Sequence, residues 1–220
     1  MVAALVDALA RAGGEPPAAL ADPYAIVLHE NAGYLIDDDK RDALYARIAA
    51  LAPSAVAMIA ADHDALLAIA RDGGMRPEER VARWRAIAEI TLDEADGDLL
   101  AALRTLPLGR ARTLLARYPA IGAPGVDRIL LFSEIAAVPS ADSNGLRVLE
   151  RYGAVAAGQP YARSYRDACA ALRAAFGDDA AALRRAYLVL RQHGKTLCRR
   201  AVPDCPRCSV RASCPSSTAR

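Results

Sequence analysis

Apolar residues recur along most of the chain at the three- and four-residue spacing of amphipathic helices. No run alternates apolar and polar residues in the manner of a half-buried strand, and no convincing hairpin signal occurs. The pattern therefore predicts an all-α protein. The expected helices cover residues 2–12, 23–35, 38–51, 54–60, 63–71, 77–92, 98–104, 108–117, 123–135, 143–152, 161–175 and 178–193.

Glycine and proline separate these helices, for example at Gly73-Gly74 and Pro139. Asp22 followed by Pro23 is typical of a helix start, because aspartate caps backbone N–H groups and proline fits the first turn. The 220 residues suffice for one large domain or two small ones. No apolar run is long enough to span a membrane, and the N-terminus lacks a signal-peptide layout, so we expect a cytoplasmic protein.

Charge is distributed unevenly along the chain. The formal net charge of +2 does not by itself indicate a nucleic-acid-binding protein. From residue 191 to residue 220, however, seven basic residues accompany a single acid, Asp204, which leaves −4 for the remainder. This basic segment is either a solvated tail or, as we favour, a surface that faces phosphate groups. Its members are Arg191, Lys195, Arg199, Arg200, Arg207, Arg211 and Arg220.

Four cysteines in the last twenty-three residues have the spacing C-x6-C-x2-C-x5-C: Cys198, Cys205, Cys208 and Cys214. In a chain without a secretory signal, such close cysteines indicate a metal or cluster site more than disulfides. A structural zinc site usually has two C-x2-C or histidine pairs, and one C-x2-C occurs here. A [4Fe–4S] cluster needs four thiolates and tolerates uneven loops. The cluster is favoured, with zinc, disulfides and free thiols as alternatives.

The tail from His193-Gly194 through Cys214 resembles the iron–sulfur loop of the endonuclease III and adenine glycosylase branch of the helix-hairpin-helix DNA glycosylases. The resemblance implies that the four cysteines hold a [4Fe–4S] cluster. It also implies that the cluster is structural and holds its loop against DNA phosphates. The loop arginines concerned are Arg199, Arg200 and Arg207.

The stretch from Tyr118 to Val126 is similar to the family's hairpin, which we expect to occupy about residues 107–135. On this match Ala120, Ile121 and Gly122 form the turn that approaches a DNA phosphate. The match continues without a gap to Val148 and places Asp142 on the family's catalytic aspartate. Taken alone, Asp142 is a good N-cap for the following helix, and the two roles are compatible.

The run from Asp22 to Glu30 resembles the adenine glycosylase pattern of Pro-Tyr, apolar residues and Leu-x-Glu. The resemblance implies that Glu30 protonates the departing base, whereas the alternative is a salt-bridged acid in the core. Tyr34 and Leu35 stand where that enzyme has glutamines on the helix that wedges into the duplex. Tyr34 either stacks in the gap left by a flipped base or is simply packed.

The resemblance as a whole implies two helical domains. We expect a six-helix barrel domain at 23–136, a cluster domain formed by 1–22 with 137–220, and a DNA-binding cleft between them that holds Glu30 and Asp142. The implied function is excision of a damaged or mismatched base from double-stranded DNA by a monomer. No region follows the cysteines that would match the adenine glycosylase's domain for oxidised guanine, so another substrate is expected and the base stays open.

Strand cleavage is not expected. The family's bifunctional members use a lysine eighteen residues before the aspartate, and that position is Pro124 here. The two lysines of the chain, Lys40 and Lys195, do not match a buried amine nucleophile. The prediction is a monofunctional glycosylase. The alternatives are a bifunctional glycosylase and lyase, or a non-catalytic protein that binds damaged DNA.

Overall fold

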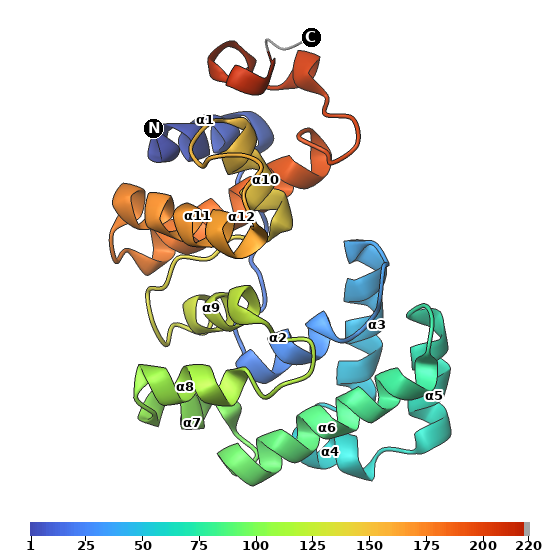
Figure 1. Cartoon of the computed structure of the whole chain (residues 1–220). Helices are drawn as coiled ribbons and strands as arrows, with labels where there is room; N and C mark the ends of the chain where they lie inside the picture. Colours follow the sequence, from blue (N-terminus) through green and yellow to red (C-terminus); the bar gives the residue numbers. More distant parts are fainter. Residues whose placement is uncertain (218–220) are drawn as a thin grey trace. The chain divides into compact units, whose positions relative to one another are not determined.

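The computed structural model describes residues 1–217, and within that range the chain forms twelve α-helices and no strand (Figure 1). The all-α prediction is confirmed. Arg220, a member of the expected basic segment, lies outside the described residues. The helices are α1 Val2–Gly13, α2 Pro23–Glu30, α3 Asp38–Leu51, α4 Ala55–Ala60, α5 His63–Asp72, α6 Pro77–Ala95, α7 Leu99–Thr105, α8 Leu108–Leu115, α9 Ala123–Phe132, α10 Ser143–Arg151, α11 Tyr161–Phe176 and α12 Ala180–Thr196.

Most helix ends lie within three residues of the prediction, but the helix expected at 23–35 is wrong beyond Glu30. The chain leaves α2 because the Asn31 side chain turns back to donate to the carbonyl oxygen of Val27 at 3.0 Å. Leu35 then adopts a left-handed backbone with φ of 53°, which no helix allows. Tyr34 and Leu35 therefore lie on a loop between α2 and α3, and not on a helix.

The chain divides into two compact units: Met1–Ala19 with Ala136–Arg220, and Leu20–Ile135. We call these the terminal unit and the central unit. The sequence led us to expect boundaries after residues 22 and 136. None of the described helices is long and apolar enough to cross a membrane.

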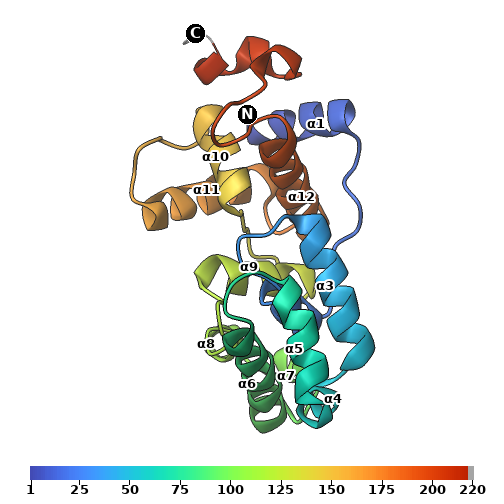
Figure 2. The ribbon, with the colours of Figure 1, turned by 90° about the vertical axis from the view of Figure 1, so that its right-hand side faces the viewer.

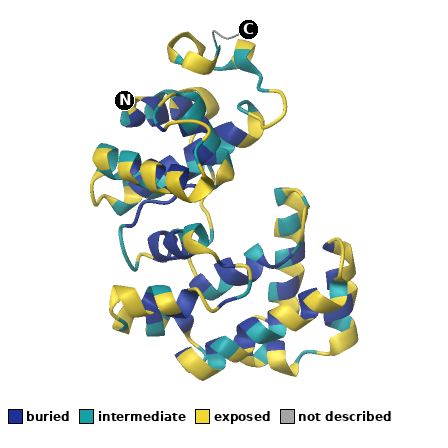
Figure 3. Ribbon diagram, viewed as in Figure 1, coloured by how far each residue is buried: buried dark blue, intermediate teal, exposed yellow. Residues whose placement is uncertain are grey.

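The central unit contains α2 to α9 and is built around Trp84 of α6, which is fully buried. The Trp84 indole N–H donates to the carbonyl oxygen of Asn31 at 2.9 Å, so this large side chain also fixes the end of α2. Helix α2 contacts α3, α6, α7 and α9, and α6 contacts α2, α4, α5 and α7, so these two helices form the centre of the unit. Figure 3 colours the ribbon of the buried residues in these helices dark blue.

The terminal unit packs α1, α10, α11 and α12 together, as Figure 2 shows from the side. Its most extensive contact joins α10 to α12. Leu149 of α10 and Leu190 of α12 are fully buried there. After α12 the chain continues into three short 3-10 turns, Cys205–Arg207, Arg211–Ser213 and Pro215–Ser217.

Aspartate side chains begin many of these helices. Asp22 accepts a hydrogen bond from the backbone N–H of Ala25 at 2.8 Å, which confirms the helix start predicted from Asp22-Pro23. A cap of this kind satisfies a backbone donor that the helix itself leaves without a partner, and typically contributes about 1 kcal/mol. Asp142 caps α10 in the same way.

Candidate functional site

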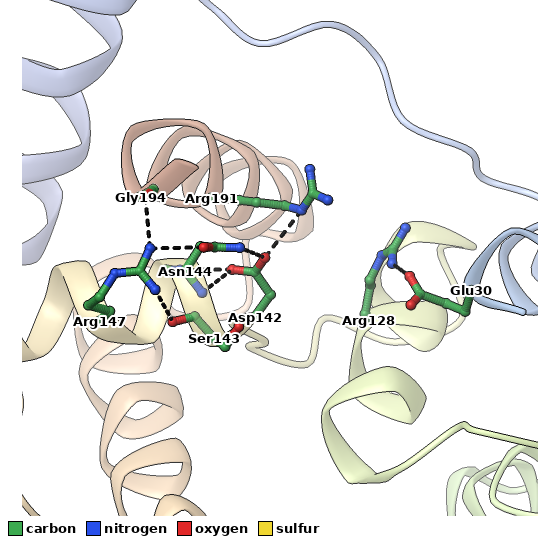
Figure 4. Close-up of polar contacts among 9 residues, drawn as sticks. Glu30, Arg128, Asp142, Ser143, Asn144, Arg147, Arg191 and Gly194 are labelled. Carbon is green, nitrogen blue, oxygen red and sulfur yellow. Dashed lines mark hydrogen bonds and ion pairs between the residues drawn. The ribbon is translucent and has the colours of Figure 1, made fainter. Parts of the chain in front are cut away.

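Asp142 lies at the N-terminus of α10, where its carboxylate is held by four donors (Figure 4). Oδ1 accepts from the backbone N–H groups of Asn144 at 3.0 Å and Gly145 at 2.7 Å. Oδ2 accepts from the Asn144 side-chain amide at 3.0 Å and forms an ion pair with Nε of Arg191 at 3.2 Å. The side chain remains 21% exposed, so the predicted cap is confirmed and the carboxylate still reaches solvent.

A hydrogen-bond network joins this carboxylate to the start of the cysteine-rich tail. Arg147 donates from Nη2 to Oδ1 of Asn144 at 2.8 Å and to the carbonyl oxygen of Gly194 at 2.7 Å. Its Nε donates to the carbonyl oxygen of Cys198 at 3.0 Å. Burial lowers the pKa of Arg147, although the nearby thiol of Cys198 opposes that change. Arg147 thus connects the Asn144 amide, and through it Asp142, to the first cysteine of the tail.

Gly194 allows the two helices to come this close. A Cβ atom built on Gly194 would lie 2.6 Å from the carbonyl oxygen of Asn144 and 2.8 Å from its carbonyl carbon. Both are backbone atoms, which cannot rotate away. Gly194 belongs to the His193-Gly194 pair that the sequence placed just before the cysteines, and its small size now has a physical reason.

All four cysteines of the tail, Cys198, Cys205, Cys208 and Cys214, line one cavity of about 440 Å³ in the terminal unit. Each is a free thiol of intermediate exposure. Burial raises the pKa of Cys208, and the thiols of Cys198, Cys214 and Cys205 raise it further. Among residues 1–217, however, no three histidine, cysteine or acidic side chains are arranged to hold a metal ion.

The tail nonetheless suits a thiolate-bound group. The four donors face one cavity, and Arg151 braces the surrounding loop by donating to the carbonyl oxygens of Arg199 at 2.8 Å and Arg200 at 3.1 Å. Arg151 Nη1 also lies 3.5 Å from the Cys198 sulfur. Hydrogen-bond donors near sulfur stabilise a negatively charged thiolate cluster. The four cysteines are thus donors of the type that an iron–sulfur cluster takes, and they line one cavity, although they are not gathered into a ready-made metal site.

Arg199, Arg200 and Arg207 of the basic segment are exposed. The backbone of the first two is fixed by Arg151, as described above, whereas their side chains extend outward. Arg207 forms an ion pair with Asp204 at 3.3 Å. The described tail therefore presents cations on a braced loop, in agreement with the charge pattern of the sequence.

Glu30, the last residue of α2, forms an ion pair with Arg128 of α9 (Figure 4). The two side chains are 31% and 16% exposed. The next residue, Asn31, is buried and donates from its side chain to the carbonyl oxygen of Pro119 at 2.9 Å. The end of α2 is therefore attached both to α9 and to the turn that precedes α9.

That turn, between α8 and α9, contains the three residues predicted to approach phosphate. Ala120 is exposed and has a left-handed backbone with φ of 59°, a conformation that costs a non-glycine residue free energy. Ile121 is buried and anchors the turn. Gly122 is exposed, precedes α9, and a Cβ built on it would meet only Pro124 at 3.9 Å.

Two loops of the central unit form an exposed apolar surface. Tyr34 is 55% exposed, Leu35 82% and Met75 67%. The backbone N–H of Tyr34 donates to the carbonyl oxygen of Gly73 at 3.0 Å, so the loops are joined. Buried Arg80 holds the second loop through the carbonyl oxygens of Ala70 and Met75 at 2.6 and 2.9 Å. We call Tyr34, Leu35 and Met75 the apolar tip.

No protein-family model matches this sequence, and no curated protein matches it. Several solved structures match this chain. They include a trapped covalent endonuclease III–DNA intermediate, with a TM-score of 0.76 and 14% identity over 97% of this chain and 93% of that chain. A thermostable thymine-DNA glycosylase gives a TM-score of 0.79 and 14% identity over 100% and 97%. A non-covalent endonuclease III–DNA complex gives 0.77 and 14% over 98% and 94%.

This chain has the same fold as these endonuclease III and thymine-DNA glycosylase structures. Within that fold, Asp142 and the cysteine-rich tail belong to the terminal unit, whereas Glu30, the hairpin turn and the apolar tip belong to the central unit. Five further side chains support these features within their units: Asn31, Met75, Arg128, Arg147 and Arg191. The sequence did not single out the first four, and it named Arg191 only as a member of the basic segment. Four of the five are polar residues with partners on other elements; Asn31 also bonds its own helix, and Arg147 bonds both α10 and the end of α12. Met75 alone carries the simple signal of an apolar residue beside Gly73-Gly74.

Proposed function

We propose that the protein is a DNA glycosylase that removes a damaged or mismatched base from double-stranded DNA. The observation that carries this proposal is the carboxylate of Asp142, fixed by the cap of α10 in a fold that the compared glycosylases share. A glycosidic bond to a base breaks through a sugar with oxocarbenium character. A preorganised anion beside that sugar lowers the barrier, and it can also orient the attacking water.

The proposed reaction ends at base release. Strand cleavage through a Schiff base needs a neutral amine at the sugar. Pro124 in the first turn of α9 has its nitrogen within the backbone, and Lys40 is exposed at the start of α3. We therefore propose attack by water and an intact abasic site as the product. The hairpin turn at Ala120 to Gly122 and the arginines of the tail bind backbone phosphates, and the apolar tip fills the space of the extruded nucleotide.

Glu30 is the second proposed catalytic residue, and its partner constrains its role. A general acid must hold a proton, whereas the ion pair with Arg128 is made by the ionised carboxylate. Protonation of the leaving base by Glu30 therefore requires that Arg128 first release it. Bases that leave without protonation, such as uracil or thymine opposite guanine, are accordingly the better proposed substrates, and adenine is the poorer one.

Cys198, Cys205, Cys208 and Cys214 would hold a [4Fe–4S] cluster, which supplies a rigid covalent centre for the loop. Arg147 and Arg151 of α10 would then pass that rigidity to the helix, because they donate to the carbonyl oxygens of Cys198 and Arg199 in the loop. Arg147 also donates to Asn144 at the start of α10. The cluster has no step in base release.

The proposal is tested by incubating the purified protein with duplexes that each carry one modified or mismatched base, followed by alkaline cleavage of abasic sites. At least one duplex should lose its base, and without alkali its strand should stay intact. Failure of every duplex, while the protein still binds them, would favour the alternative of a non-catalytic binding protein.

A further inference from the structure

The carboxylate of Asp142 has no acceptor position to spare. A carboxylate offers about four lone-pair sites, and the described donors supply four bonds: two backbone N–H groups to Oδ1, and the Asn144 amide with Arg191 Nε to Oδ2. An anion that faces the sugar or orients water needs at least one of these positions. One of the four donors must therefore be exchanged when substrate arrives.

Three of these donors belong to the cap itself. The N–H groups of Asn144 and Gly145 are part of the first turn of α10, and the Asn144 amide is fixed by Arg147 at 2.8 Å. Arg191 differs, because it reaches across from α12 on a long side chain that is 29% exposed (Figure 4). The pair is partly exposed, and a DNA phosphate offers the guanidinium another charged acceptor, so the exchange costs little.

We propose that Arg191 is a DNA-responsive positioning residue: it binds Asp142 in the free protein and exchanges that carboxylate for a DNA phosphate in the complex. The inference rests on the proposed function. Arginine is a strong donor to phosphate, and Arg191 begins the basic segment that continues to the exposed Arg199 and Arg200. The exchange also moves a cation away from the carboxylate just where positive charge develops on the sugar, which favours the reaction.

The exchange predicts energetic coupling between residues 142 and 191 in DNA binding. We would measure affinity and its salt dependence by fluorescence anisotropy, using an undamaged duplex and one with a tetrahydrofuran abasic analogue. Arg191→Met should reduce the salt slope by about one, as loss of one phosphate contact does. Asp142→Asn should tighten binding about three- to tenfold when Arg191 is present, and less than about twofold in the Arg191→Met background.

Arg185 provides the matched control, because it is another ion-paired arginine of α12 whose partners are Asp7 and Glu15. In the Arg185→Met background, Asp142→Asn should tighten binding as much as it does in the wild type. Equal tightening in the Arg191→Met background would overturn the proposal. Arg191→Lys keeps the charge and should retain most of the salt slope, and it replaces Arg191→Met if that variant melts early.

Single-turnover excision with saturating protein distinguishes two roles of Arg191: exchange of its partner on DNA binding, or support of Asp142 in its working position. If Arg191 competes with the sugar for Asp142, Arg191→Met raises the rate constant about threefold, because no complex then retains the ion pair. If Arg191 instead holds Asp142 in its working position, the rate constant falls and the salt slope stays unchanged, which would contradict the inference. Should no duplex lose its base, the proposed function fails, while the binding cycle still decides whether Arg191 is exchanged.

Discussion

Replacement of Gly194 by alanine tests the close approach of α12 to α10. An alanine Cβ would lie 2.6, 2.8 and 2.9 Å from the oxygen, carbonyl carbon and Cβ of Asn144. In a helix, alanine is otherwise more favourable than glycine by about 0.8–1.0 kcal/mol. Overpacking costs about 1–3 kcal/mol, and the upper part of that range applies because two of the contacted atoms are backbone. We expect a net loss of about 1–2 kcal/mol in the free energy of unfolding.

Thermal unfolding followed by circular dichroism measures the effect. At the size of this chain, the loss corresponds to a melting temperature lower by about 2–8 °C. Gly109→Ala is the matched control, since Gly109 also lies in a helix but a Cβ there meets nothing within 4 Å. The control should be as stable as the wild type or more so, by up to about 1 kcal/mol. If Gly194→Ala behaves like the control, the helices do not approach each other as described.

Three further predictions concern the chemistry. Borohydride treatment during excision should trap no covalent protein–DNA adduct, because Pro124 stands at the lysine position; a high yield of adduct would refute the water mechanism. The purified protein should contain about four iron atoms, and Cys205→Ala should lose iron, stability and DNA affinity together. Stoichiometric zinc without iron in the wild-type protein would contradict the cluster. Under single-turnover conditions, Glu30→Gln should slow excision of adenine more than excision of uracil, and Arg128→Met should raise the rate for adenine relative to that for uracil. Equal effects on both bases would show that Glu30 is not the general acid.

Helical periodicity and capping chemistry were sufficient to predict the all-α fold, because most helices carry an amphipathic pattern of their own and many have an aspartate at the start. The one exception is the helix expected at 23–35. The apolar pattern of 23–35 continues past Glu30, but the Asn31 side chain competes with the helix by bonding Val27 and Pro119, and the chain turns away. A local pattern cannot reveal a partner that lies 88 residues further along the chain.

Some residues of the candidate site could likewise be predicted from the sequence, and others could not. Asp142, the turn residues and the cysteines are carried by contiguous motifs, so their positions could be named from sequence. Arg128, Arg147 and Arg191 act through partners on other elements, and in a chain this rich in arginine no spacing distinguishes them. Only the folded structure reveals that four donors engage the Asp142 carboxylate, or that Arg147 joins it to Cys198 through Asn144.

The single-turnover excision rate constant of Asp142→Asn shows most directly whether the carboxylate of Asp142 drives base release. Asparagine has nearly the same shape and its oxygen can still cap α10, but it has no charge to stabilise the sugar. On the best wild-type substrate we predict a rate constant lower by about a hundredfold or more, with DNA affinity equal to or tighter than that of the wild type. A rate constant within about threefold of the wild-type value would show that the chemistry takes place elsewhere.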